Sequence, residues 1–290
     1  MTNWAIGIIG GSGLYDIPGL TDRQSIVVDS PFGAPSDAIV TGRLGETPVA
    51  FLPRHGRDHR LSPTEVDPRA NIDALKRLGC TDILALSAVG SLRKALPPGI
   101  FVVVDQYVDR TFAREKSFFG DGVVAHVSMA QPVCPRLSAM ALAAARAAGA
   151  KAVQGGTYLA MEGPQFSTAA ESRLYRAWGC DVIGMTGMPE AKLAREAELP
   201  YASVCMVTDY DAWREGEAGV EVSDVLAVMR GNAQRAQALV AAFVAALPAQ
   251  RAPSPLDTAL DGAVITPAAA WNPQTVARLS AVAGRVLAQG

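Results

Sequence analysis

The sequence predicts a layered α/β domain with a mainly parallel or mixed β-sheet. Short apolar runs rich in β-forming residues alternate with longer helical patterns along most of the chain. The 290 residues are enough to bury a large core. Several of the apolar runs are followed directly by glycine, hydroxyl or charged residues. Open α/β sheets bind ligands beyond the carboxyl ends of their strands, so these positions are the first candidates for a site.

Strands are predicted at the short apolar runs. They cover residues 5–9, 38–42, 49–53, 82–86, 100–104, 157–161, 181–185 and 202–207. The second and third are expected to form a hairpin around Gly45. The fourth is expected to enter a turn over residues 87–91.

Helices are predicted at the longer patterns. They cover residues 68–78, 135–148, 168–178, 189–198, a long stretch that begins at Ser223, and a short tail helix over 274–287. Asp67 is expected to cap the first helix, with Pro68 in the first helical position. Gly149 is expected to end the second. In the long helix, apolar residues recur at three- and four-residue spacing.

Composition excludes several classes of protein. Almost half of the residues are apolar and the net charge is −2, so neither disorder nor a nucleic-acid partner is expected. The four cysteines are scattered and form no CxxC pair, which favours reduced thiols in the cytoplasm over disulfides. No cysteine or histidine spacing resembles a metal-ligand set. The N-terminal stretch lacks the basic region of a signal peptide, and the apolar run 238–247 is too short to span a bilayer.

Two carboxylates follow the last predicted strand. Asp209 and Asp211 are one residue apart, and residues at this spacing point the same way in an extended chain. They could therefore reach one edge of a ligand, such as the ring nitrogen and exocyclic amine of a purine. The alternative is that both are solvated turn residues, because Asp-Tyr-Asp is ordinary turn chemistry.

Phosphate donors follow four other strands. The loop Gly10-Gly11-Ser12-Gly13 offers backbone N–H groups and a hydroxyl, although a plain tight turn fits it equally well. Arg54 and His55 follow the strand that ends at residue 53, and arginine binds phosphate through a planar fork. A solvated basic loop is the alternative there. Residues 87–91 and Thr186 add hydroxyl and backbone donors at two further strand ends.

Two single residues have weaker signals. Phe166 lies in a loop just before a helix and could stack on a base, although such a residue is more often part of the core. His126 lies in a loop, where a lone histidine is usually structural.

Taken together, these segments resemble the trimeric purine nucleoside phosphorylase superfamily and, within it, the S-methyl-5′-thioadenosine phosphorylases. The matching segments occur in the family's order: GIIGGSGLYD, SPFGAPSDAIVTG, PRHGRDHRLSP, ANIDALKRLGC, SAVGSLR, FVVVDQYVDRT, EGPQFSTAAESRLYRAWGCDVIGMT and MPEAKLAREAELPYASVCMVTDYDAW. They cover roughly residues 5 to 245. The resemblance implies a three-layer phosphorylase-type fold with a central mixed β-sheet flanked by helices. It divides the chain into a nucleoside phosphorylase domain, 1–250, and a packed tail, 251–290, with a short helix.

The resemblance also implies a set of site residues. The phosphate would be held by Ser12, Arg54, His55, Ser87, the backbone amide of Ala88, and Thr186. The ribose would rest on Met185, and the base would meet Phe166, Ser167, Asp209 and Asp211, with the two aspartates as catalytic groups. The methylthio group would contact Val222, Val225, Leu226 and His126 of an adjacent subunit. A cytoplasmic homotrimer is therefore expected, with a nucleoside and phosphate as its small-molecule partners and neither metal nor organic cofactor.

The implied reaction converts S-methyl-5′-thioadenosine and phosphate into adenine and 5-methylthioribose 1-phosphate, a step of purine and methionine salvage. Gly187-Met188 departs from the Thr-Val common in adenosine-type relatives and resembles the MTGMPE of the methylthioinosine branch. Phosphorolysis of methylthioinosine or another 6-oxopurine nucleoside is thus the alternative, and Asp209 argues against it. A nucleotide-binding oxidoreductase would need a helix after Gly13, which Pro18 breaks. A non-catalytic purine-binding module is a third alternative.

Overall fold

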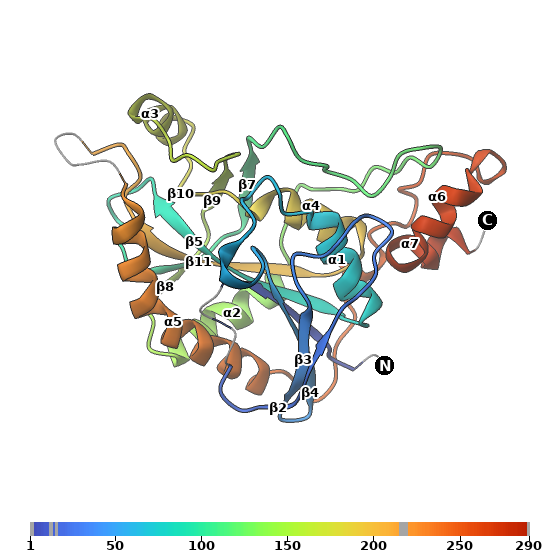
Figure 1. Ribbon diagram of the computed structural model, residues 1–290, viewed down its shortest axis with the longest axis horizontal. Helices are drawn as coiled ribbons and strands as arrows, with labels where there is room; N and C mark the ends of the chain where they lie inside the picture. The colour runs from blue at the N-terminus through green and yellow to red at the C-terminus, as the bar shows by residue number, and fades with distance from the viewer. Residues whose placement is uncertain (1–2, 12–13, 15–16, 215–219, 289–290) are drawn as a thin grey trace.

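One mixed β-sheet forms the centre of the molecule (Figure 1). The computed structural model describes residues 3–11, 14, 17–214 and 220–288. Within them the sheet has eleven strands: β1 Ile6–Gly10, β2 Leu20–Ile26, β3 Ile39–Leu44, β4 Thr47–Pro53, β5 Asp82–Ser91, β6 Phe101–Val103, β7 Gln106–Asp109, β8 Ala152–Gln154, β9 Thr157–Ala160, β10 Val182–Gly184 and β11 Tyr201–Asp209. The main path runs β2-β3-β4-β1-β5-β10-β9-β7, while β11 joins β5 to β6 and β6 joins β8.

Helices pack on both faces of this sheet, so the predicted layered α/β fold is confirmed (Figure 1). The helices are α1 Pro68–Arg77, α2 Pro135–Ala147, α3 Ala169–Ala177, α4 Gly187–Glu196, α5 Val222–Ala245, α6 Pro273–Arg278 and α7 Ser280–Leu287. Helices α2 and α5 pack together against one face, and their apolar residues share a core cluster with β1 and β4. Helices α1, α4 and α7 contribute to a second cluster on the other side.

Several predicted local signals are confirmed. Asp67 caps α1 by accepting hydrogen bonds from the backbone N–H groups of Arg69 and Ala70. Gly45 has a φ of 57° in the turn between the antiparallel strands β3 and β4. Thr168, which was predicted to begin the helix over 168–178, is instead the N-cap of α3 in a complete capping box with Glu171. These devices satisfy backbone groups at element ends, which is why short-range sequence could predict them.

Strand β5 differs from the prediction of a short strand and a turn over residues 87–91. It continues to Ser91 because β11 pairs with it up to Gly90 on one edge and β10 pairs with its last two residues on the other. One edge pairs with β11 along most of its length. The other pairs first with β1, up to Ala85, and then with β10 at Gly90 and Ser91.

Other differences concern weakly patterned segments. Strands β2, β7 and β8 were not predicted, since β2 is mostly exposed and polar and the other two are short. Helix α5 begins after Glu221, so Ser223 lies inside the helix and is not its N-cap. The tail helix predicted over 274–287 is divided at Leu279 into α6 and α7.

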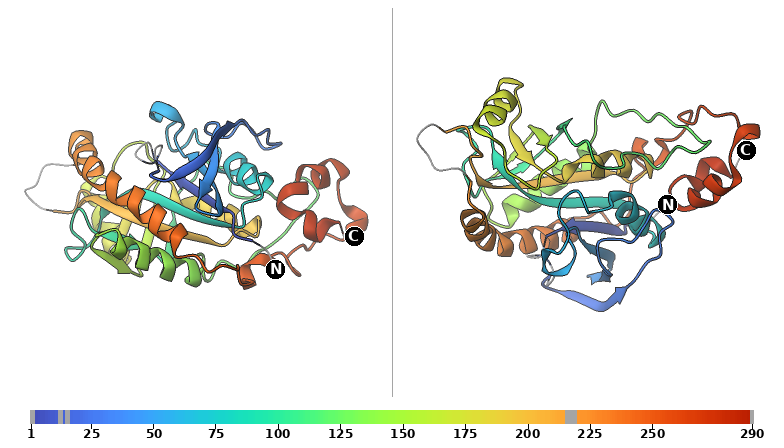
Figure 2. Two further views of the ribbon diagram at one scale, coloured as in Figure 1. Left: turned by 90° about the horizontal axis from the view of Figure 1, so that it is seen from below. Right: turned by 45° about the horizontal axis from the view of Figure 1, so that its top comes forward.

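The segment after α5 crosses back over the domain to the end opposite the first turns of α5 (Figure 2). Short 3₁₀ turns occur at Pro255–Thr258 and Ala268–Ala270, before α6. Arg251 is buried in ion pairs with Asp82, the first residue of β5, and with Asp257. Leu260 and Leu279 belong to the same core cluster as α1 and α4. Among the described residues, no helix is long and apolar enough to cross a membrane.

Candidate active site at the strand ends

Strand β5 has a gap in its pairing where the predicted site residues meet. Between Ala85, the last partner of β1, and Gly90, the partner of β10, no described strand pairs with this edge of β5. Arg54 enters the gap, because its backbone N–H donates to Gly10 O at 2.9 Å and its Nη1 donates to Leu86 O at 2.8 Å. Arg54 therefore follows the end of β4 and contacts the end of β1 and the middle of β5.

The Arg54 guanidinium is held from the far side by Glu190, in the first turn of α4. Nε and Nη2 donate to the two carboxylate oxygens at 2.8 and 3.0 Å. Arg54 is only 3% exposed. Burial alone would lower the pKa of Arg54, but the Glu190 carboxylate outweighs it and holds the pKa above its usual value. The arginine is therefore a permanent cation in the site.

Ser87 follows Leu86 in β5, and its side-chain hydroxyl lacks a hydrogen-bond partner among the described residues. Its side chain is buried, and its Oγ makes no hydrogen bond to any described residue. Buried hydroxyls in folded proteins are almost always hydrogen-bonded, so this donor fits an acceptor that belongs to a ligand. Ala88 follows and is partly buried. Ser12, also predicted to donate here, lies outside the described residues.

Thr186 is the N-cap of α4, and the N-terminus of a helix favours an anion. Its own N–H and that of Gly187 face the Tyr158 hydroxyl at 3.4 Å. A Cβ on Gly187 would lie 2.7 Å from Cε1 of Tyr107, so this position needs glycine. Arg54 and Thr186 thus reach the site from two directions and are joined through Glu190.

His55 follows Arg54 and is a neutral donor–acceptor. Its Nδ1 lies 3.0 Å from Leu61 O, which can only accept, so Nδ1 carries the proton. Burial, together with the charge of Arg54, lowers the pKa of His55 to about 4. The ring stacks on His59 with centroids 4.3 Å apart. At neutral pH its Nε2 is therefore an acceptor, suited to a protonated phosphate oxygen.

Asp209 and Asp211 occupy a turn, so the expected extended spacing is wrong. Strand β11 ends at Asp209, and Asp211 has a φ of 51°. Asp209 accepts from the Thr208 hydroxyl and from the backbone N–H of Asp211, each at 2.7 Å. The turn chemistry that was the alternative is present, yet it brings both side chains to Gly90. A Cβ there would lie 2.8 Å from Oδ1 of Asp209 and 3.4 Å from Cβ of Asp211.

Asp211 has the more unusual environment. It is 9% exposed, and its Oδ2 has no hydrogen-bond partner among the described residues. Burial raises the pKa of Asp211, an effect that the nearby hydroxyls of Ser172 and Ser167 partly oppose. Ser167 precedes α3, so it brings the loop of Phe166 to the same place. Phe166 itself is 40% exposed, so one part of its ring is accessible to a base that could stack on it.

Arg114 and Glu162 were not singled out in the sequence, yet they organise the site. Arg114 donates to Glu162 and to the backbone carbonyls of Met185 and Met188. Glu162 also accepts from Thr64 Oγ1 at 2.5 Å and from the Phe112 N–H at 2.7 Å. These donors lower the pKa of Glu162 to about 2, although burial acts in the opposite direction. The two residues are 48 apart in the chain, so no local pattern could link them.

The residues predicted for the methylthio pocket are not brought together within one chain. Val222 and Leu226 are 61% and 45% exposed at the start of α5, and Val225 is partly buried beside them. His126 is exposed in a loop whose neighbours pair with the tail: the Val124 N–H donates to Thr266 Oγ1 at 2.9 Å. In Figure 1, α5 lies at one end of the molecule and the tail helices lie at the other.

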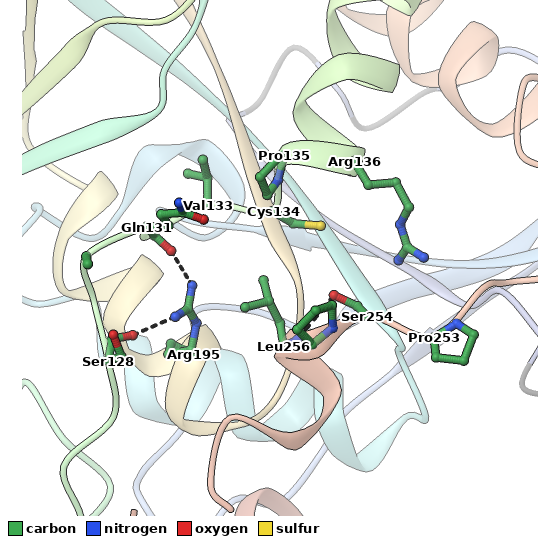
Figure 3. Close-up of a pocket in the computed structure, with 12 residues that line it drawn as sticks. Ser128, Gln131, Val133, Cys134, Pro135, Arg136, Arg195, Pro253, Ser254 and Leu256 are labelled. Atoms are coloured by element: carbon green, nitrogen blue, oxygen red, sulfur yellow. Dashed lines mark hydrogen bonds between the residues drawn. The ribbon is translucent and has the colours of Figure 1, made fainter.

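A separate pocket lies away from the strand ends (Figure 3). It has a volume of about 500 Å³ and lies between the N-terminus of α2 and the tail residues 253–256. Arg195 lines it and donates to the backbone carbonyls of Ser128 and Gln131. None of the predicted site residues contributes to its wall. The described residues also contain no cluster of histidine, cysteine and carboxylate side chains that could hold a metal ion.

Comparison with known proteins assigns the class. A family model described as the phosphorylase superfamily matches residues 5–245. The chain therefore belongs to this superfamily.

Individual relatives narrow the class. A protein of Cereibacter sphaeroides named S-methyl-5′-thioadenosine phosphorylase is 59% identical, over 97% of this chain and 98% of its own length. One of the same name from Bradyrhizobium diazoefficiens is 54% identical over 99% of both chains. Within the superfamily, the chain belongs to the S-methyl-5′-thioadenosine phosphorylase family.

Solved structures agree. A methylthioadenosine phosphorylase sourced from an Antarctic soil metagenomic library superposes with a TM-score of 0.90 at 47% identity, covering 97% of this chain and 99% of its own. A mutant of the Schistosoma mansoni adenosine/methylthioadenosine phosphorylase, in complex with methylthioadenosine, has a TM-score of 0.81 at 39% identity. It covers 86% of this chain and 93% of its own.

Proposed function

We propose that the protein catalyses phosphorolysis of S-methyl-5′-thioadenosine, giving adenine and 5-methylthioribose 1-phosphate. The carrying observation is the gap in β5, where the unpartnered Ser87 hydroxyl lies next to Leu86, whose carbonyl holds Arg54. A fixed cation, a free buried donor and the N-terminus of α4 together suit an oxyanion. The family to which the chain belongs indicates that the nucleoside is S-methyl-5′-thioadenosine.

Phosphate serves as co-substrate and nucleophile. Arg54, Ser87, Thr186 and the Ala88 amide would hold its oxygens, with Ser12 completing the set, and Nε2 of His55 would accept from a protonated oxygen. The bond between the ribose and the base breaks through an oxocarbenium-like state, as expected for a cleaving glycosidic carbon. The bound phosphate stabilises this cation and then attacks it, so positioning and electrostatics dominate. No cofactor takes part in this scheme.

The base leaves with the electron pair of the broken glycosidic bond, and the two aspartates would stabilise the charge that this pair brings. Asp209 would protonate or hydrogen-bond N7 of adenine, and Oδ2 of Asp211 would accept from the exocyclic amine. Phe166 would stack on the ring, Ser167 would border it, and Met185 would support the ribose. A positioned acid of this kind contributes roughly 10²- to 10⁴-fold.

The departure at Gly187 concerns packing more than base choice. Its Cβ direction is filled by Tyr107 and Tyr158, which are core residues. A threonine would collide with these rings, whichever base were bound. This weakens the case for methylthioinosine, while Asp209 continues to favour an adenine.

The proposal extends to the assembly. A cytoplasmic homotrimer would place His126 of one subunit over Val222, Val225 and Leu226 of the next. The exposure of these apolar side chains in a single chain supports this arrangement. The four buried, free cysteines suit a reducing compartment. The match over residues 5–245 supports a phosphorylase domain of residues 1–250, with 251–290 as a packed tail.

One assay tests the function. Release of free base is measured from methylthioadenosine, adenosine and methylthioinosine, with and without phosphate. We expect turnover only with phosphate or arsenate, and the highest kcat/KM with methylthioadenosine. Equal turnover in phosphate-free buffer would identify a hydrolase, and a preference for methylthioinosine would place the protein in that branch.

A further inference from the structure

Three buried side chains form a chain that ends at the phosphate site. Arg54 follows β4, Glu190 is in the first turn of α4, and Tyr201 begins β11. Glu190 is 3% exposed and Tyr201 is 2% exposed. The Tyr201 hydroxyl donates to Oε1 of Glu190 at 2.7 Å, and both carboxylate oxygens accept from Arg54. Neither Glu190 nor Tyr201 has a part in the mechanism given above.

The hydrogen bonds of Arg54 show how Glu190 and Tyr201 fix the orientation of its guanidinium. A guanidinium has five N–H groups in one plane. Two of them donate to Glu190 and one donates to Leu86 O, and no other described residue accepts from the one that remains on Nη1 or the one on Nη2. Because the fork is planar and rigid, fixing three N–H groups also fixes the direction of the remaining two. These two are available to a bound phosphate.

We infer that Glu190 is a positioning residue, which aims the free N–H groups of Arg54 at the phosphate and is itself held by Tyr201. This inference rests on the proposed function. Glu190 lies in the first turn of α4, four residues after the N-cap Thr186, so it connects Arg54 to the part of the chain that carries the other half of the phosphate site.

The direction in which Glu190→Gln changes the KM for phosphate separates a positioning role from a purely electrostatic or purely structural one. Glu190 carries a negative charge close to where an anion binds, so its charge alone opposes phosphate binding. If charge were its only effect, Glu190→Gln would lower the KM for phosphate. If it only supported the core, stability would fall and the KM for phosphate would stay the same. A positioning role predicts a higher KM for phosphate.

The experiment measures kcat and the KM values for phosphate and methylthioadenosine in the folded variants. Glu190→Gln should raise the KM for phosphate roughly 10-fold, since misplacement of a binding group by about 1 Å can cost up to about 10²-fold. Tyr201→Phe, which keeps the ring and removes the hydroxyl, should raise it in the same direction but less. The KM for methylthioadenosine should change less than about 3-fold, within the effect of a distant substitution.

A double-mutant cycle tests whether Glu190 acts through Arg54. Glu190→Gln in an Arg54→Ala background should leave the KM for phosphate unchanged or lower it, because the group being aimed is gone and only the opposing charge of Glu190 is removed. A further rise in that background would overturn the inference. So would an unchanged or lower KM for phosphate in the Glu190→Gln single variant.

A matched control uses the other buried arginine–carboxylate pair, Arg251 and Asp82. Asp82→Asn should lower stability and leave the KM for phosphate at the wild-type value. A rise equal to that of Glu190→Gln would show a general effect of core damage and would overturn the inference. If wild-type protein shows no phosphate-dependent turnover, the proposed function fails and this inference falls with it. If wild-type protein shows phosphate-dependent turnover and Glu190→Gln has the wild-type KM for phosphate, the proposed function stands and the positioning role does not.

Discussion

The carboxylate of Asp209 accepts a hydrogen bond of 2.7 Å from the backbone N–H of Asp211. This bond closes the turn at the end of β11 and sets the two side chains relative to each other. Asp209 also accepts from Thr208, so both of its oxygens already have one donor. A carboxylate has about four lone-pair sites, and the remaining ones can face a ligand. Oδ2 of Asp211, by contrast, has no partner among the described residues.

Asp209→Asn should separate chemistry from structure. An asparagine oxygen can still accept from the Asp211 N–H, so the turn should persist. The variant loses a proton donor at N7, and activity on methylthioadenosine should fall by roughly 10²- to 10⁴-fold. Activity on methylthioinosine should be spared or improved, because an amide suits the donor and acceptor pattern of a 6-oxopurine. Steady-state kinetics with both nucleosides measure this, and wild-type behaviour of the variant would contradict a catalytic role for Asp209.

Asp211 should give the enzyme a pH dependence. Burial raises its pKa, so this carboxyl takes up a proton at a higher pH than an ordinary aspartate does. Once protonated it accepts less well from the exocyclic amine, and kcat/KM should fall as the pH drops through this raised value. Asp211→Asn cannot titrate, and it should remove that part of the acid limb. An acid limb that is identical in both proteins would exclude Asp211 as its source.

Sequence predicted the parts of the fold that local physics controls. The cap at Asp67, the turn at Gly45 and the long apolar periodicity of α5 all depend on near neighbours. The continuation of β5 to Ser91 depends on β11 and β10, which lie far away in the chain. A Ser-Ala-Val-Gly-Ser segment has the composition of a turn, and pairing with these two distant strands makes it part of β5.

For the candidate site, sequence likewise indicated the residues at strand ends but not the distant residues that hold them in place. Residues at strand ends, such as Arg54 and Thr186, could be found because α/β sheets gather these ends. The partners that hold them could not be found, because Glu190 lies 136 residues from Arg54. Residues supplied by a second subunit, as proposed for His126, are beyond what one chain can show.

Arg54→Ala should reveal the phosphate contact. The variant removes a fixed cation with two free N–H groups, and hydrogen bonds to charged groups contribute about 1.5–3 kcal/mol each. The KM for phosphate should therefore rise by at least about 10-fold, a conversion of about 1.4 kcal/mol. Kinetics at varied phosphate with saturating nucleoside measure it. An unchanged requirement for phosphate would leave Arg54 with a purely structural role.

His55 should make the folded protein sensitive to acid. Its pKa is about 4 when folded against 6.5 when free, so below pH 6.5 the unfolded chain takes up a proton that the folded protein resists. Stability from this group is fully present above pH 6.5 and is lost as the pH falls toward 4. Between pH 7 and pH 5 the loss should be about 2 kcal/mol. Urea unfolding of wild type and His55→Gln measures it, and the variant should lose less stability by about that amount. Equal losses in both would place the pKa of His55 near its ordinary value.

The first turns of α5 should decide the preference at the 5′ position. Val222 and Leu226 are four residues apart, so they share one face of the helix, and both are exposed in a single chain. In a trimer this face would be covered by the loop of His126 and would surround the methylthio group. One methyl-sized group in an apolar pocket contributes roughly 1–3 kcal/mol, so adenosine should have a 10- to 200-fold lower kcat/KM than methylthioadenosine. Leu226→Ser should narrow this ratio mainly by lowering the kcat/KM for methylthioadenosine, and His126→Ala should do the same from the neighbouring subunit.

Light scattering should find three chains in the active species. A fully active monomer, or equal efficiency on both nucleosides, would show that these residues form no such pocket.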